Sequence, residues 1–292
     1  MHCLRIVYQG LSCKGNGGAF LNLSQKFNKL KNILSKMENA IVAYSGGVDS
    51  TLLLKVAGEV MGENVLAITA SSPTYPQKEI KAARDMARNL GIRHITITTD
   101  ELSNPEFFSN PLNRCYFCKK ELFSRLKEIA EKNRIRFILD GSNYDDRKDF
   151  RPGDRAKQEF GIRSPLAEAG LTKKDIRVLS KKMGLPTWDK PSLACLASRF
   201  PYGSSLNRAE LKMVNKAEEY LHALGFRQVR VRHYGNTARI EVEKSKIPLL
   251  VNHSSMVVRK LKRLGYTYIT VDLEGYRTGS MNEVLQRCHS RH

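Results

Sequence analysis

A loop of small and polar residues is the first part of this chain whose residue types and spacing indicate chemistry. Residues 45–50 read Ser-Gly-Gly-Val-Asp-Ser and follow the short apolar run 40–44. A helix-like pattern comes next, so the chain is expected to run from a strand through a glycine turn into a helix. The adjacent Gly46 and Gly47 let the backbone turn tightly and approach a ligand closely. N–H groups at the start of the helix then face an anion, and the helix dipole adds to the attraction.

The polar residues of this loop suit a nucleotide phosphate. Ser45 and Ser50 supply hydroxyl donors, and Asp49 is able to hold a divalent cation against the phosphates. The loop lacks the lysine that follows the second glycine of a Walker loop. It resembles instead the pyrophosphate loop (PP-loop) of ATP pyrophosphatases, which bind the β- and γ-phosphates of ATP while chemistry happens at the α-phosphate. The alternative is an ordinary Gly-Gly turn that carries serine and aspartate.

Three cysteines form the second candidate site. Cys115 and Cys118 make a Cys-x-x-Cys motif just ahead of a predicted helix, and Cys195 lies in a later non-periodic segment. A spacing of three residues puts both sulfur atoms on one side of a helical turn. The helix N-terminus and the flanking Arg114 and Lys119 are expected to lower the thiol pKa values and to favour thiolates.

Four interpretations of these cysteines remain open at this point. A thioredoxin-like redox pair lacks its expected fold, and a structural zinc site needs four ligands where three cysteines stand out. The thiols could also be small buried hydrophobic groups. The fourth interpretation is a [4Fe–4S] cluster with three protein ligands, whose open iron would carry an extra sulfide for transfer. The predicted PP-loop favours this cluster, because adenylation and sulfur delivery are complementary halves of one reaction.

Composition limits the class of protein. Apolar residues make up 41% of the chain, enough for a sizeable core, and no run approaches the roughly 20 residues of a membrane span. The net charge of +20 suggests anionic partners such as nucleotides, although lysines scattered over solvated helix faces explain it equally. An ATP-using chain is expected in a reducing compartment, the cytoplasm, where disulfides are rare.

Alternating strand and helix patterns predict an α/β fold with a doubly wound parallel sheet. Strands are expected near 40–44, 65–69, 92–98 and 137–139, with helices at 23–39, 76–90, 119–132 and 172–184. Ligands of such sheets bind at the carboxyl ends of the strands. Both 45–50 and 140–146 lie at such ends, so they are expected to come together.

Later residues predict a smaller C-terminal α+β domain. Helices are expected at 207–224 and 246–264, and strands at 228–233, 238–242 and 266–273. A helix, Leu-Gly, an aromatic residue and a strand occur twice in this order, as a short internal repeat. The predicted organisation is a disordered leader (1–22), a PP-loop domain (23–190), a connector with Cys195 (191–206), a C-terminal substrate and oligomerisation domain (207–285), and a tail (286–292).

Together the motifs resemble the ATP-dependent sulfur transferases called LarE, which sulfurate pyridinium-3,5-biscarboxylic acid mononucleotide for the nickel-pincer cofactor of lactate racemase. The resemblance covers roughly residues 23–285. It rests on segments that are specific jointly rather than singly: 45–50, 140–146, 151–153, 163–166, 198–203, 229–232 and 238–241.

The LarE family has two branches, and the resemblance assigns this chain to one of them. In one branch a single cysteine gives up its sulfur and becomes dehydroalanine. In the other, three cysteines hold a [4Fe–4S] cluster, and Cys115, Cys118 and Cys195 match this pattern. The resemblance therefore implies a catalytic homo-oligomer with these three residues as cluster ligands. It leaves the sulfide source unknown.

The resemblance also implies how the nucleotide is used. Attack of a substrate carboxylate on the α-phosphate of ATP gives an acyl-adenylate, and electrostatic binding of the departing pyrophosphate is the main catalytic contribution expected. Its implied ligands are the loop residues Ser45, Gly46, Gly47 and Ser50, together with Mg²⁺ near Asp49. Ser72 and Gly141 sit where this nucleotide fold usually meets adenosine.

Three arginines are candidates for binding a substrate phosphate. Arg230 and Arg232 alternate onto one face of a predicted strand, and a pair of guanidinium groups suits a phosphate. Arg199 could serve similarly. The alternative is an exposed basic strand face, and the resemblance favours the substrate. Glu218 and Glu241 could bind a metal ion or form surface salt bridges.

Two other functions compete with this interpretation. A tRNA thiolation enzyme also pairs a PP-loop with a three-cysteine cluster, and the net charge would suit tRNA. No extra RNA-binding module is evident, so nucleic acid is the less favoured partner and a small mononucleotide the expected one. A nucleotide-binding or zinc-binding scaffold is the non-enzyme alternative, and it would lack iron and acid-labile sulfide.

Overall fold

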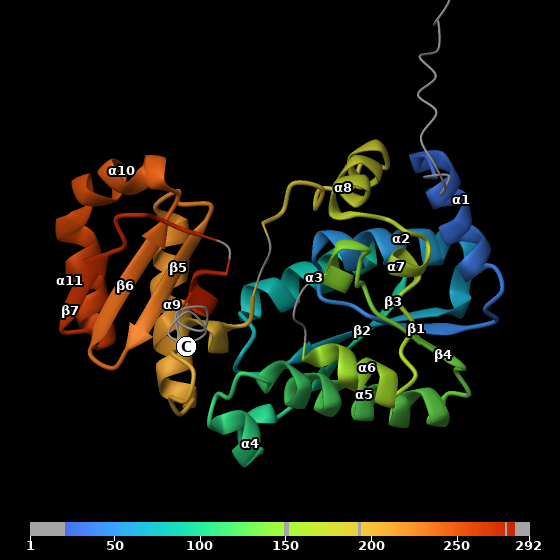
Figure 1. Ribbon diagram of the computed structural model, residues 1–292, viewed down its shortest axis with the longest axis horizontal. Helices are drawn as coiled ribbons and strands as arrows, with labels where there is room; N and C mark the ends of the chain where they lie inside the picture. Colours follow the sequence, from blue (N-terminus) through green and yellow to red (C-terminus); the bar gives the residue numbers. More distant parts are fainter. Residues whose placement is uncertain (1–20, 149–151, 192–193, 278, 284–292) are drawn as a thin grey trace, which may run out of the picture.

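The structure is a computed structural model that describes residues 21–148, 152–191, 194–277 and 279–283. Nearly all of the predicted leader and the whole predicted tail lie outside these residues. The described chain forms two regions joined by a connector, with the larger N-terminal region on the right of Figure 1 and the C-terminal region on the left.

A four-stranded parallel sheet is the centre of the N-terminal region. Its strands are β1 (Ala40–Ala43), β2 (Val65–Ser71), β3 (Arg93–Thr98) and β4 (Phe137–Leu139). They lie in the order β3-β2-β1-β4, and every pair is parallel. Along the chain, β2 and β3 are added on one side of β1, and β4 is then added on the other side of β1. Parallel sheets of this kind bind ligands where the growth direction reverses, here between β1 and β4.

Helices cover both faces of this sheet (Figure 1), as the doubly wound prediction requires. One face packs on α1 (Leu23–Leu34), α2 (Val48–Met61), α3 (Gln77–Asn89), α7 (Pro165–Glu168) and α8 (Lys173–Lys182). The other packs on α5 (Arg114–Lys132) and α6 (Gly153–Glu159). The continuous run Leu52–Leu54 is fully buried in the first core, so α2 contacts the core over much of its surface.

The connector is packed against both regions. It contains a short 3₁₀ turn (Leu196–Arg199) and leads into α9 (Arg208–Ala223). Its apolar residues share a core with α4 (Pro105–Phe108), in which Phe107 and Phe200 are both fully buried. Backbone hydrogen bonds add to this contact, since Leu206 N donates to Phe108 O at 3.0 Å.

The C-terminal region is the predicted small α+β unit. Strands β5 (Val229–Tyr234), β6 (Thr237–Val242) and β7 (Tyr268–Val271) form a sheet in that order, antiparallel between β5 and β6 and parallel between β6 and β7. The aromatic residues of the internal repeat, Phe226 and Tyr266, are both buried in one core behind this sheet.

One helix prediction in this region is wrong. A single helix was expected over 246–264, but α10 (Ile247–Asn252) and α11 (Ser254–Leu264) are separate helices that meet at His253. Asparagine, histidine and serine at this junction all have weak helix propensity, so breaking the helix there costs little free energy.

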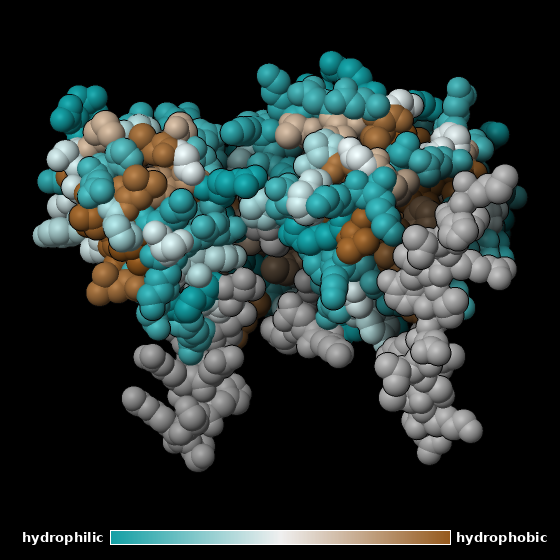
Figure 2. All heavy atoms as spheres, turned by 90° about the horizontal axis from the view of Figure 1, so that it is seen from above, coloured by the Kyte–Doolittle hydropathy of each residue, from teal (hydrophilic) through white to brown (hydrophobic). Residues whose placement is uncertain are grey.

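Apolar side chains gather on the upper face of the C-terminal region, seen as brown spheres on the left of Figure 2. Leu249, Val251 and Met256 on α10 and α11 are among the exposed large hydrophobic residues.

Of the helices in the described ranges, none has the length and apolar character needed to span a membrane. The predicted homo-oligomer stays a prediction.

Candidate active site

The PP-loop sequence forms the expected strand, turn and helix. β1 ends at Ala43, and α2 begins at Val48 with Gly47 at its N-cap and no side chain capping its first N–H groups. The Oγ atoms of Ser45 and Ser50 lie 3.1 Å apart across the turn. Free N–H groups and paired hydroxyls at a helix N-terminus are suited to bind an anion.

Gly46 is required by the geometry of this turn. Its φ is +68°, in the left-handed region, and a Cβ atom there would lie 2.9 Å from Cβ of Ala83 on α3. The Gly46 carbonyl accepts a hydrogen bond of 3.0 Å from Nζ of Lys190, which also forms a 2.7 Å ion pair with Glu79. Lys190 therefore connects the loop to the start of the connector.

Gly141, in the turn after β4, packs closely against the first turn of α2. A Cβ atom at this position would lie 2.9 Å from the backbone N of Ser50. Gly141 follows Asp140, whose carboxylate accepts hydrogen bonds from Ser142 Oγ at 2.7 Å and Ser164 Oγ at 2.6 Å. These hydrogen bonds fix the turn after β4 to the N-cap of α7, and the turn holds Gly141 against the start of α2.

The Gly141→Ala substitution is expected to weaken ATP binding about tenfold or more. The added methyl group must displace the first turn of α2, and overpacking of this kind costs ~1–3 kcal/mol. Isothermal titration with ATP and Mg²⁺ measures the effect. Gly161→Ala, outside the cavity lining and with no atom within 4 Å of the added methyl group, is the control for loss of a glycine elsewhere. Equal affinities for the two variants would contradict this role of Gly141.

Asp49 is the charged residue of the loop. Nζ of Lys173, from α8, donates to Oδ2 of Asp49, whereas Oδ1 is buried without a hydrogen-bond partner among the described residues. Burial raises the pKa of Asp49, and Lys173 only partly opposes this effect. An unsatisfied carboxylate oxygen beside a phosphate site is the type of ligand that Mg²⁺ prefers, so the site fits the predicted cation.

A cavity of about 410 Å³ opens at this edge of the sheet. Residues from both sides of the switch point line it, including Ser45, Gly47, Asp49, Ser50, Asp140, Gly141, Asp146 and Lys173. Thr69 and Ala70, at the end of β2, form another wall. The volume and the mixture of apolar and polar lining suit a nucleotide.

Ser72 lies outside this lining, although the sequence placed it near adenosine. Its Oγ donates to Oε1 of Glu101 at 2.5 Å, and Oγ1 of Thr74 donates to the same oxygen at 2.5 Å. Glu101 is buried, a position that its sequence neighbours do not reveal. The adenosine contact of Ser72 therefore stays a prediction.

Cys115 and Cys118 belong to α5, and Cys195 lies in the connector. The helix begins at Arg114, so Cys115 and Cys118 belong to its first turns rather than preceding it. Cys118 and Cys195 pack against the same apolar core, and none of the three described cysteines forms a disulfide. Tyr75 connects this group to the cavity, because it lines the cavity and its hydroxyl lies 3.5 Å from Sγ of Cys118.

The expected lowering of the thiol pKa values is wrong for Cys118. Burial raises the pKa of this thiol to about 12, and the charges of Glu101 and Cys195 raise it further than Lys119 lowers it. Burial overrides the helix N-terminus because the charged form loses its hydration.

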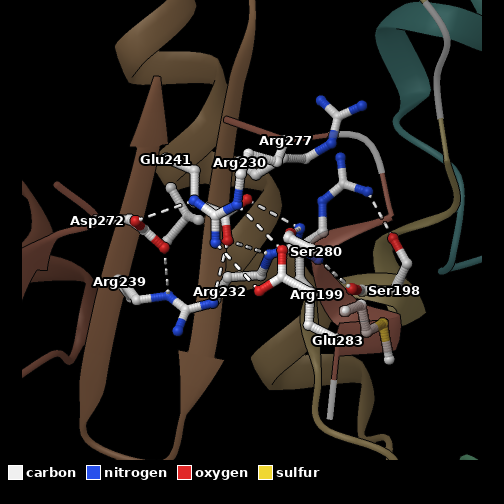
Figure 3. Close-up of polar contacts among 12 residues, drawn as sticks. Ser198, Arg199, Arg230, Arg232, Arg239, Glu241, Asp272, Arg277, Ser280 and Glu283 are labelled. Atoms are coloured by element: carbon white, nitrogen blue, oxygen red, sulfur yellow. Dashed lines mark hydrogen bonds and ion pairs between the residues drawn. The ribbon is translucent and has the colours of Figure 1, made fainter. Parts of the chain in front are cut away.

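The predicted arginines lie in a buried network that joins the connector to the C-terminal region (Figure 3). Arg199 forms two hydrogen bonds of 2.8 and 2.9 Å with Glu218, and Arg232 forms two of 2.8 Å with Glu241. Arg230 is buried between them, and its pKa falls to about 10 because of burial and the charge of Arg199.

Two alternatives raised by the sequence are therefore wrong. The strand face is not an exposed basic surface, since Arg230 and Arg232 are 5% and 8% exposed. Glu218 and Glu241 form buried rather than surface salt bridges, with exposures of 5% and 0%. Substrate binding by Arg199, Arg230 and Arg232 stays a prediction.

Comparison with known proteins identifies the family of this chain. A sequence model for NAD synthase matches residues 22–140, which contain the PP-loop. A protein of Synechocystis is 45% identical over 267 residues, covering 91% of this chain and all of the relative. Pyridinium-3,5-bisthiocarboxylic acid mononucleotide synthase of Lactiplantibacillus plantarum is 40% identical over 266 residues, covering 91% of this chain and 96% of that enzyme. The chain belongs to the LarE family of PP-loop proteins. A protein of Methanocaldococcus jannaschii is 34% identical over 257 residues, covering 87% of this chain and 98% of the relative.

The three cysteines of this LarE chain are the candidate ligands of the predicted cluster. In the part of the chain that the structure describes, no three His, Cys, Asp or Glu side chains are arranged to hold one ion. In a [4Fe–4S] cluster each thiolate binds a different iron, so its ligands lie farther apart than those of one ion. Arg114 lies near Cys115 and Cys195, Cys118 lies near Cys195, and none of the three forms a disulfide. A cluster held by these three cysteines stays a prediction.

Proposed function

We propose that this chain is an ATP-dependent sulfur transferase that adenylates the carboxylates of pyridinium-3,5-biscarboxylic acid mononucleotide and converts them to thiocarboxylates. One observation carries the proposal. Tyr75 forms part of the nucleotide-sized cavity and also contacts Cys118, so the phosphate site and the thiols are neighbours. A reaction that activates a carboxylate with ATP and then delivers sulfur needs this proximity.

The PP-loop residues act in the first half of the reaction. A carboxylate is a poor acyl donor until its oxygen is joined to the α-phosphate of ATP, which makes AMP the leaving group. The N–H groups of α2 and the hydroxyls of Ser45 and Ser50 bind the pyrophosphate that departs. Asp49 would hold Mg²⁺ through Oδ1, and Lys173 keeps its other oxygen in place.

The cysteines act in the second half. Cys115, Cys118 and Cys195 would hold a [4Fe–4S] cluster, which supplies sulfide to the activated carbonyl when bound. The core around Phe107 and Phe200 keeps water away from one side of this centre. Exclusion of water protects an acyl-adenylate against hydrolysis.

An anaerobic assay tests the proposal. Protein with reconstituted iron and sulfide is incubated with ATP, Mg²⁺, sulfide and the dicarboxylate mononucleotide, and mass spectrometry follows the exchange of oxygen for sulfur. Thiolated mononucleotide with equimolar AMP and pyrophosphate is expected. Thiolated nucleosides in a tRNA digest, without thiolated mononucleotide, would instead support the tRNA enzyme and overturn the proposal.

A further inference from the structure

Lys190 joins the phosphate-binding loop to the connector that carries Cys195. Its Nζ atom lies 3.0 Å from the carbonyl oxygen of Gly46 and 2.7 Å from the carboxylate of Glu79. The Lys190 side chain is 21% exposed and that of Glu79 is 26% exposed, so both contacts are partly shielded from water. A hydrogen bond from a charged donor is stronger than a neutral one. Lys190 therefore holds the carbonyl end of one peptide group in the loop.

The N–H end of the same peptide group belongs to Gly47 and faces the anion site. It donates to Oγ of Ser45 at 3.4 Å, and both residues line the nucleotide-sized cavity. In a planar trans peptide the C=O and N–H bonds point in opposite directions, so a contact that fixes the oxygen of Gly46 also fixes this N–H. An ammonium group on the oxygen polarises the peptide and makes its N–H a better donor.

This peptide group depends on such a contact more than an ordinary one does. It lies between two glycines, Gly46 and Gly47, which allow it to rotate at little steric cost. A rotated peptide would turn its carbonyl oxygen toward the phosphates and its N–H away from them. The ammonium group of Lys190 stabilises the orientation in which the N–H faces the site.

The connector is fixed on both sides of Cys195. Before it, Nη2 of Arg177 on α8 donates to the carbonyl oxygen of Lys190 at 3.0 Å. After it, Leu196 N donates at 2.9 Å to the carbonyl oxygen of Thr74, in the segment that follows β2. The start of the connector and the phosphate loop therefore share one lysine.

We propose that Lys190 is a positioning residue for pyrophosphate binding, which orients the peptide group between Gly46 and Gly47 and thereby couples the phosphate site to the connector of Cys195. This inference rests on the proposed function and adds a residue to its first half-reaction. Lys190 acts through the loop, and the N–H of Gly47 is the group that binds the pyrophosphate.

Pyrophosphate binding to the full-length protein tests this role. Isothermal titration with Mg²⁺ and pyrophosphate needs neither cluster nor mononucleotide, so its result does not depend on which reaction is catalysed. The Kd is expected to rise about tenfold in Lys190→Met and less in Lys190→Arg, which keeps a charged donor. Lys182→Met, at an exposed lysine on α8, is the matched control and should bind like the wild type. An unchanged Kd in Lys190→Met would overturn the inference and leave the proposed function standing.

A double variant separates positioning from simple charge. Glu79 lines the cavity, and in Lys190→Met its carboxylate loses a partner and would repel pyrophosphate. Adding Glu79→Gln removes that charge, and positioning requires the double variant to bind as weakly as Lys190→Met. Recovery of wild-type affinity would contradict it. A loss that disappears at about 0.5 M salt would contradict it too, because salt screens charge without reorienting a peptide group.

Trp188, the single tryptophan of the chain, reports on the coupling. It lies two residues before Lys190 and is 37% exposed, so acrylamide can quench its fluorescence. Pyrophosphate with Mg²⁺ is expected to reduce this quenching in the wild type, because a loop fixed by its ligand holds Lys190 and the connector more firmly. Lys190→Met should lose this response. A response of equal size in both proteins, or none in the wild type, would refute the coupling.

Discussion

Pyrophosphate release by Asp49→Asn is expected to fall on the order of 100-fold or more, because Asp49 offers the one buried carboxylate oxygen in the loop that lacks a hydrogen-bond partner among the described residues. An amide of the same shape cannot neutralise Mg²⁺ beside the phosphates. A coupled pyrophosphate assay at saturating ATP measures the loss. Release at the wild-type rate would remove Asp49 from the site.

The same substitution is not expected to lower stability at neutral pH. Burial raises the pKa of Asp49 in the folded protein above its unfolded value. The ionised form is therefore disfavoured by folding, and the stability that the protonated group contributes is lost as pH rises through the folded pKa. Thermal unfolding of Asp49→Asn should show a midpoint equal to or above that of the wild type. Asp85→Asn on α3 is the matched control, with normal activity expected.

Activity below neutral pH follows from the same shift. Mg²⁺ binding requires the carboxylate, so wild-type pyrophosphate release should begin to fall at a higher pH than an ordinary aspartate would cause. Asp49→Asn, with its residual rate, should show no such fall over this range.

Cys195→Ala is expected to abolish thiolated product while pyrophosphate release stays within about twofold of the wild type, since the residue lies beside Cys118 rather than in the nucleotide cavity. The two half-reactions are followed separately, by mass spectrometry and by the pyrophosphate assay. Iron content after anaerobic reconstitution should fall as well. Normal thiolated product would exclude Cys195 as a ligand or donor.

Cys288→Ala, at a cysteine without a surrounding motif, is the control for loss of a thiol in general. The wild-type protein should keep its mass after turnover. Loss of one sulfur atom from Cys195 would instead indicate that the protein itself is consumed.

Local sequence determined the phosphate loop of this protein. Two glycines between an apolar strand and a helix favour a tight turn. Gly46 adopts the left-handed φ that only glycine adopts readily. The alternation of strands and helices likewise determined a doubly wound sheet, because a parallel strand pair requires a crossover element. The aromatic residues of the internal repeat marked the C-terminal core correctly.

Tertiary packing alone decided what surrounds these local motifs. Strand order brings Gly141 against Ser50 across 91 residues of chain, and α8 supplies Lys173 to Asp49. Residue type says nothing about such partners, since they depend on which elements pack together. Burial is likewise a property of the whole fold. It reverses the expected pKa shift of Cys118.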